Sequence, residues 1–178
     1  MNFDHFTIKA QEALQQAVQR ASQGGQQAIE PLHVLAGVLA VGENVTRFLL
    51  SKLGVNEKNL TDTISRQLAH RPRVTGGEPY LSRESQEVIN RATELARHDG
   101  DDFVGLETLL RALLAVPSDA ATVLKDAGIT EKALAEAVRE LRGGAKATSA
   151  SSEDTYQALS KYATQPAVAE RATASSTP

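Results

Sequence analysis

The chain carries two copies of one motif, and this repeat restricts its fold more than any other feature of the sequence. The stretch Phe6–Glu12 returns as Leu81–Glu87, at an offset of 75 residues. A turn at Gly54 returns as a turn at Gly128, at an offset of 74 residues. The one-residue difference falls in the loop after the first predicted helix, where chains tolerate deletions. The sequence therefore predicts two similar units that pack on one another.

Each copy has the apolar spacing of four helices. Apolar residues recur at i, i+3, i+4 and i+7 through residues 10–21 and again through residues 88–96, and Thr7 and Ser82 precede these runs as N-caps. Further helices are predicted to start near residues 31, 44 and 56 in the first copy and near residues 106, 118 and 130 in the second. The predicted fold is all-α, a pseudo-two-fold domain made of a duplicated four-helix repeat with eight helices.

Composition divides the chain into a folded part and a C-terminal part. Residues 1–142 form the predicted domain, with repeat one at 6–70 and repeat two at 81–142. Two Pro and two Gly in residues 71–80 mark a connector between the repeats. Residues 143–178 are predicted to follow as a flexible linker at 143–152, a short amphipathic segment at 154–163 and a disordered tail at 164–178.

Composition also excludes several classes of protein. Cysteine is absent, so disulfides, thiolate catalysis and cysteine-based zinc sites are ruled out, and the absence fits the reducing cytoplasm in which we expect the protein to act. The longest apolar stretch, Val34–Gly42, is far shorter than the about 20 residues that span a bilayer, and the N-terminus has no signal-peptide pattern. The net charge of −3 argues against nucleic acid as the main partner.

No motif in the chain predicts catalysis or a cofactor. A P-loop needs a Gly-Lys-Ser/Thr ending, yet no glycine is followed by lysine and no lysine by serine or threonine. The acidic stretch His98–Asp102 lacks the alternating spacing of a calcium loop, which favours a polar turn over a metal site. His33 has no catalytic partner that the sequence can assign. We therefore expect a protein that is not an enzyme and binds no metal or cofactor.

Residues 1–142 resemble the Clp N-terminal repeat domain. The resemblance is carried by Phe6–Glu12, by Ile29–Leu35 with its Glu-Pro-Leu-His sequence, and by the glycine turns at the same place in each copy. The run Glu153–Tyr162 is similar to the segment that enters the first ATPase module in ClpB-type chaperones. After Tyr162 the resemblance stops, and no ATPase module follows in this sequence.

The resemblance implies a polypeptide-binding module of a ClpB-type disaggregase, which captures unfolded or aggregated chains for ATP-driven threading. The implied partners are those chains, an AAA+ motor ring in cis and an Hsp70 system, while the domain itself is expected to be a monomer. One alternative is an adaptor-docking regulatory domain of the ClpA/ClpC type, which would bind one folded protein. Another is a structural helical module without a ligand. Binding to reduced, unfolded model proteins distinguishes the first reading from the other two.

The apolar stripe of residues 88–96 supplies two candidate polypeptide-binding residues, Ile89 and Leu95. Leu95 occupies the position that Arg20 holds in the first copy, so one repeat has an apolar residue where the other has a charge. A surplus apolar stripe leaves a groove able to take an apolar peptide. The competing interpretation is that Leu95 fills the core, and the sequence does not decide between the two.

The resemblance also implies three polar surface positions tied to chaperone activity, namely Thr7, Asp101 and Glu107. They would rim the apolar groove and orient a bound chain. Each has a simpler role as well, since Thr7 fits an N-cap and the two acids flank the start of a helix, where negative charge is favoured. We expect Asp101→Ala and Glu107→Ala to leave the melting temperature within a few degrees of the parent chain while slowing recovery of aggregated protein by a complete chaperone.

Overall fold

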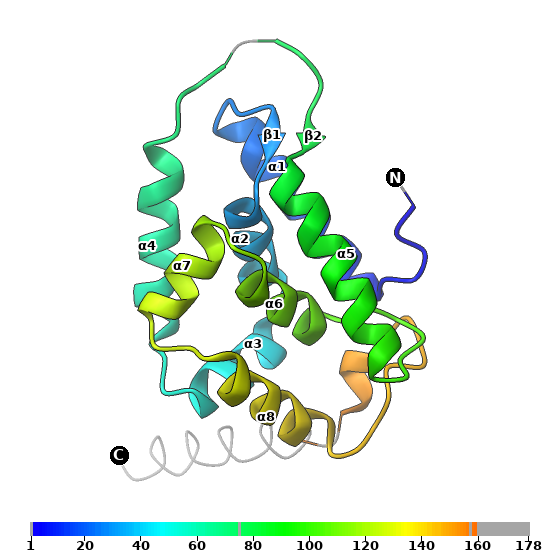
Figure 1. Ribbon diagram of the computed structural model, residues 1–178. Helices are drawn as coiled ribbons and strands as arrows, with labels where there is room; N and C mark the ends of the chain where they lie inside the picture. Colours follow the sequence, from blue (N-terminus) through cyan, green and yellow to red (C-terminus); the bar gives the residue numbers. More distant parts are fainter. Residues whose placement is uncertain (1, 75, 157, 160–178) are drawn as a thin grey trace, which may run out of the picture.

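Eight α-helices form within residues 8–142 of the computed structural model, which describes residues 2–74, 76–156 and 158–159 (Figure 1). The helices of repeat one are α1 (Ile8–Gln23), α2 (Pro31–Val41), α3 (Glu43–Lys52) and α4 (Glu57–Ala69). Those of repeat two are α5 (Arg83–His98), α6 (Leu106–Ala115), α7 (Asp119–Asp126) and α8 (Glu131–Arg142). The prediction of an all-α fold built from a duplicated four-helix repeat is confirmed.

Local capping chemistry sets the helix ends at the predicted places. The side chain of each N-cap accepts a hydrogen bond from the backbone amide three residues later, which satisfies one of the free amides of the first turn. The residues that do this are Thr7, Asn56, Ser82, Ser118 and Thr130. Gly54 and Gly128 follow α3 and α7 in the left-handed region, at φ of 70° and 92°. A side chain at either position would be strained, which explains why both copies keep glycine there.

The two helices α2 and α6 form the centre of the fold. Residues 31–38 of α2 are all buried, as are residues 106–110 of α6. A helix that is buried on every side must be surrounded by other elements of the fold. The remaining helices supply that cover with one apolar stripe each, so the core is built from Leu, Val, Ile and Ala with few aromatic rings.

Helices α1 and α2 approach one another closely at Gly37. A Cβ atom at this position would lie 2.1 Å from the carbonyl oxygen of Ala13 on α1, a separation that real Cβ atoms do not show. Ala10, Ala13 and Ala17 line the facing side of α1 and are fully buried. Small residues on both helices therefore allow the backbones to pack almost directly against each other.

Short strands connect the two repeats, although the sequence had predicted helices alone. Strand β1 (Ala28–Ile29) pairs in parallel with β2 (Tyr80–Leu81), and Phe6 forms a separate parallel bridge with Val104. Ile29 lies in repeat one and its partner Leu81 in repeat two, and the residues of the Phe6–Val104 bridge are divided between the repeats in the same way. Each pair therefore takes one residue from each repeat. The pairs lie beside the starts of α2, α5, α1 and α6, and so tie the two repeats together.

We expect repeat one to be unable to fold without repeat two. A fragment of residues 2–74 would lose the strand partners of Ile29 and Phe6 and the cover that α6, α7 and α8 provide. Circular dichroism and amide chemical shifts should show little fixed structure in this fragment, whereas the whole chain should unfold in one cooperative step. A fragment that melts cooperatively with native-like helicity would show that the repeats are independent.

Part of the segment after α8 packs on the domain, although residues 143–146 are exposed, and the flexible linker expected over residues 143–152 stays a prediction. Ala147 is fully buried, and the short 3₁₀ helix η1 (Ser152–Thr155) places Ser152 and Glu153 in the interior. Composition suggested a linker because small polar residues bury little apolar surface, but here they are held by hydrogen bonds to the domain. The predicted amphipathic segment at 154–163 lies only partly within the described residues, and the predicted tail at 164–178 lies outside them.

Candidate functional site: a buried polar cluster and an open groove

Thr7 lies at the start of α1 with its side chain fully buried. Its hydroxyl oxygen accepts a hydrogen bond from the amide of Ala10 at 3.1 Å, which is the predicted N-cap. The same hydroxyl donates to the carboxylate of Glu153 at 2.6 Å, across 146 positions of sequence. Thr7 therefore caps a helix and also holds the C-terminal segment.

Asp101, in the loop after α5, and Glu107, in the first turn of α6, bind the same arginine. Arg142, the last residue of α8, donates from Nη1 to both carboxylate oxygens of Asp101 at 2.9 Å, and from Nε to Oε2 of Glu107 at 2.9 Å. Both acidic side chains are fully buried. A buried guanidinium between two carboxylates fixes the geometry of the loop that leads into α6.

Two residues of the C-terminal segment complete the arrangement. The Tyr156 hydroxyl donates to Oε2 of Glu107 at 2.6 Å, and Oε2 of Glu153 accepts from the amide of Leu106 at 3.1 Å as well as from Thr7. The carboxylate of Glu153 thus lies at the N-terminus of α6, where the helix dipole favours negative charge. We call this set of six side chains the polar cluster: Thr7, Asp101, Glu107, Arg142, Glu153 and Tyr156.

The polar cluster contains more acids than bases, and this perturbs its titration. Burial raises the pKa of Glu153, and the nearby charge of Glu107 raises it further. Burial also raises the pKa of Tyr156. For Arg142 burial opposes the charged form, but the carboxylates of Glu107 and Asp101 outweigh it and raise the pKa. One oxygen of Glu107 and one of Glu153 are buried without a hydrogen-bond partner in the described structure, so the negative charge is only partly compensated.

These positions correct the expectation that Thr7, Asp101 and Glu107 lie on the surface and rim a groove. All three side chains are enclosed, and each touches Arg142 or Glu153. The sequence could not show this, because the partners are 35 to 146 positions away along the chain. A substitution at Asp101 or Glu107 is therefore expected to lower stability as well as alter function.

Ile89 and Leu95 lie on α5 but do not share a groove. Ile89 is buried and lines a shallow cleft of about 430 Å³ against the N-terminal residues Asn2, Phe3 and His5. Leu95 is half-buried against the core and lines none of the clefts described here. Six positions of helix separate the two side chains by roughly 120° around its axis. Leu95 is thus partly core, and the predicted single apolar stripe is divided between two faces.

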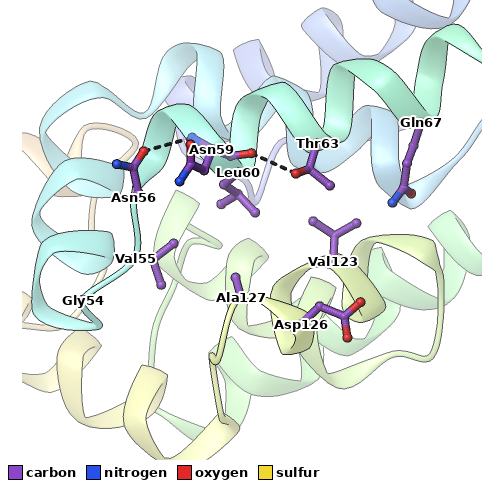
Figure 2. A pocket seen from close by; sticks show the side chains of 10 residues that line it. All are labelled: Gly54, Val55, Asn56, Asn59, Leu60, Thr63, Gln67, Val123, Asp126 and Ala127. Carbon is purple, nitrogen blue, oxygen red and sulfur yellow. Dashed lines mark hydrogen bonds between the residues drawn. The ribbon is translucent and has the colours of Figure 1, made fainter.

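A groove between α4 and α7, which reasoning from the sequence missed, has a partly apolar lining (Figure 2). Its volume is about 290 Å³, with Val55, Leu60, Val123 and Ala127 as apolar lining. The α4 wall carries uncharged polar side chains, and Asp126 stands on the α7 wall. The polar residues of the α4 wall are Asn56, Asn59, Thr63 and Gln67.

The repeat explains why this groove is open. The equivalent pair, α8 against α3, packs more closely than α4 against α7. At an offset of 74, Thr63 and Gln67 of α4 correspond to Ala137 and Leu141 of α8, which are buried. Polar residues thus stand on α4 where apolar ones close the second interface. This exchange between the copies was visible in the sequence and is the signal that could have identified the groove.

The groove continues past the end of α4 into a wider depression. Thr63 and Gln67 line both parts, and the wider part adds Arg66, His70 and Arg71. Arg71 is bound to Glu30 and Asp119 at 2.6 Å each, so it bridges the connector to both repeats. The α4 wall of the groove is therefore uncharged, whereas the wider depression carries charged side chains of both signs, with Asp119 beside the arginines.

His33 and the acidic turn have structural roles. His33 is fully buried, and its Nδ1 accepts the amide of Glu30 at 3.0 Å, while burial and then the charge of Arg71 lower its pKa to about 4. In the turn after α5, Asp99 pairs with Arg111 at 2.9 Å. Within the part of the chain that the structure describes, no three metal-binding side chains gather at one point, and no single helix is long and apolar enough to cross a membrane.

Comparison with known proteins finds sequence relatives of this chain in one family. A sequence profile described as Clp repeat (R) N-terminal domain matches residues 5–127. The chaperone protein ClpB of Bacteroides thetaiotaomicron is 56% identical over 163 residues, which cover 92% of this chain and 19% of the relative. ClpB of Porphyromonas gingivalis is 46% identical over 163 residues, which cover 92% of this chain and 19% of that relative. The chain therefore spans about a fifth of the length of these relatives.

Solved structures agree on the fold. The N-terminal domain of Hsp104 from Candida albicans superposes with a TM-score of 0.74 at 23% identity, covering 83% of this chain and 98% of that domain. The N-terminal domain of the chaperone ClpD from Arabidopsis thaliana gives a TM-score of 0.60 at 23% identity, covering 77% of this chain and 94% of that one. At such identities these structures establish the fold and no more.

Proposed function

Because the chain belongs to the family of Clp repeat N-terminal domains, we propose that it is a polypeptide-binding module that captures unfolded or aggregated chains in the cytoplasm. The longer relatives are named chaperone protein ClpB, and we extend a chaperone role to this chain as part of the same proposal. In the proposed cycle the domain holds a polypeptide weakly and passes it to an AAA+ motor ring in cis, with an Hsp70 system as a further partner.

The observation that carries the proposal is the groove between α4 and α7. Its apolar lining can take aliphatic side chains, and the carboxamides of Asn59 and Gln67 each offer both a donor and an acceptor. A peptide backbone presents both kinds of group at every residue, so such a wall can bind many sequences with little selectivity. An extended polypeptide with apolar side chains is therefore the occupant that fits both the lining and the α4 wall.

The test is a substitution that fills the groove. Ala127 is exposed at the end of α7 and lines the groove, so Ala127→Gln should obstruct it without disturbing the core. We expect the dissociation constant for a reduced, unfolded model protein to rise about tenfold, measured by fluorescence anisotropy. Thr122→Gln places the same side chain on the same helix outside the groove and is the matched control.

The competing adaptor-docking function gives a different outcome. An adaptor-docking domain would ignore the unfolded protein and bind one folded protein with a defined stoichiometry. If Ala127→Gln and Thr122→Gln bind the unfolded protein as tightly as the parent chain, the groove is not the binding site. If the parent chain does not bind unfolded protein at all, the adaptor function replaces the present proposal.

A further inference from the structure

The chain after α8 turns back onto the domain through two consecutive glycines. Gly143 and Gly144 have φ angles of 59° and 90°, in the region that favours glycine, and both are exposed. A Cβ atom at either position would meet no other atom within 4 Å. Two consecutive exposed glycines with positive φ allow large changes of backbone angle at little steric cost, as residues of a hinge do.

Beyond these glycines the chain is attached mainly by hydrogen bonds, among them one from the amide of Ala147 to Oδ1 of Asp101 at 3.0 Å. We call residues 147–156 the docked segment. The carbonyl of Ala147 accepts the amides of Asp102 at 2.9 Å and Phe103 at 3.0 Å, and the carbonyl of Ala150 accepts the amide of Ile8 at 2.8 Å. Its one large buried apolar group is the ring of Tyr156, and Leu159, three positions further along, is also buried in the core. Such a segment buries far less apolar surface than a helix of the core, so it can detach at a lower free energy than global unfolding.

The charge at the centre of the attachment also favours release. Docking buries the carboxylate of Glu153 close to Glu107, and each acid keeps one oxygen without a partner. Thr7 and the amide of Leu106 compensate only the other oxygen of Glu153. Arg142 binds Glu107 and Asp101 but makes no hydrogen bond to Glu153 among the described contacts. Docking thus adds a third carboxylate to a site with a single guanidinium.

Other charged groups around the docked segment are exposed and contribute little. Lys9 of α1 pairs with Asp154 at 2.8 Å, and both side chains face solvent. Lys146 donates to the carbonyl of Asp99 at 2.7 Å in front of the segment. Exposed pairs of this kind are weakened by water and salt, so they guide the segment without holding it.

We propose that the docked segment is a latch, which opens at Gly143–Gly144 while the eight helices stay folded, and that Thr7, Asp101 and Glu107 act by holding it closed. This goes beyond capture of polypeptide and does not depend on it, because the latch and the α4–α7 groove have no residue in common. It gives the three polar residues a mechanical role, in place of the direct contact with polypeptide that the resemblance implied.

Amide hydrogen exchange in the chain tests the latch directly. The amides of Ile8, Asp102 and Phe103 belong to the domain but donate to the docked segment, so their protection reports whether the latch is closed. In the parent chain they should exchange faster than the buried amides of α2. Glu153→Ala removes the acceptor for Thr7 and should increase their exchange at least about tenfold while α2 is unchanged. Asp154→Asn, one position along and exposed, is the matched control.

Glu153→Gln separates the effect of charge from that of shape. Because docking raises the pKa of Glu153, the closed state binds a proton more tightly than the open state. The latch is therefore firmest at low pH and weakens as the pH rises through the raised pKa. Protection of Ile8, Asp102 and Phe103, corrected for intrinsic exchange, should fall in the parent chain as the pH rises above the ordinary pKa of a glutamate. It should stay constant in Glu153→Gln, which keeps an oxygen acceptor and carries no charge.

Two results would overturn the latch. The three amides could exchange at the same rate as α2 in the parent chain, which would make the docked segment a permanent part of the fold. Alternatively, Glu153→Ala could leave their exchange unchanged, which would show that the polar cluster does not hold the segment. Both outcomes leave the binding of unfolded protein through the groove untouched, so failure of the latch and failure of the proposed function are distinguishable.

Discussion

Replacing Arg142 with methionine is expected to lower the free energy of unfolding by about 3–5 kcal/mol, the loss typical of breaking a buried ion pair on one side. The side chain lies at 8% exposure between two carboxylates that are fully buried. Methionine keeps much of the volume but leaves Asp101 and Glu107 charged and unpaired. For a domain of this size the melting temperature should fall by roughly 10 °C or more, measured by calorimetry or circular dichroism.

Arg139→Met provides the control for this prediction. Arg139 lies three positions earlier on α8, is exposed and makes no described ion pair, so its replacement should change stability by less than about 0.5 kcal/mol. Neutralising the acids in the Arg142→Met background, with Asp101→Asn and Glu107→Gln, should restore part of the loss. Equal stability of the Arg142 and Arg139 variants would mean that the acids are solvated in solution and that the polar cluster is not formed.

Gly37→Ala is expected to destabilise the domain, although helix propensity alone predicts the opposite. In an open helix this change stabilises by up to about 1 kcal/mol. Here the new Cβ would lie 2.1 Å from the carbonyl oxygen of Ala13, and backbone atoms cannot move aside as a flexible side chain does. Helices α1 and α2 would have to separate, with an expected loss of about 2–4 kcal/mol.

The prediction for Gly37→Ala is tested by whether the free energy of unfolding rises or falls. Urea unfolding of the parent chain and Gly37→Ala should give a lower midpoint for the variant with a similar slope, since the surface exposed on unfolding hardly changes. In repeat two the equivalent position at an offset of 74 is Arg111, so the close approach of α1 and α2 is a property of repeat one. A higher midpoint for Gly37→Ala would show that the helices lie further apart in solution.

The polar cluster and the groove lie in separate parts of the domain. The groove lies between α4 and α7, and the polar cluster lies where α1, α6 and α8 meet the docked segment. Figure 1 shows these regions on different sides of the central helices. Variants in one part can therefore be compared with variants in the other, and effects on binding can be distinguished from effects on the latch.

The sequence alone determined the secondary structure and the duplication. N-caps such as Thr7 and Ser82, and the turns at Gly54 and Gly128, depend on interactions within a few residues, so each can be recognised locally. The apolar period of 3.6 has the same local character, and the offset between the copies then fixed eight helices in two repeats.

Only the tertiary structure decided where the polar side chains lie and which surfaces stay open. Thr7 was predicted as a cap, but its bond to Glu153 joins the first and last parts of the described chain, and no local pattern specifies such a pair. The burial of Ala147 was not visible in the sequence, because burial by hydrogen bonding leaves no apolar signature in composition. The groove stays open because the side chains that α4 turns toward α7 are polar, whereas the equivalent side chains of α8 are apolar and pack against α3. The sequence shows this difference between the repeats, but only the tertiary structure shows which helices face one another.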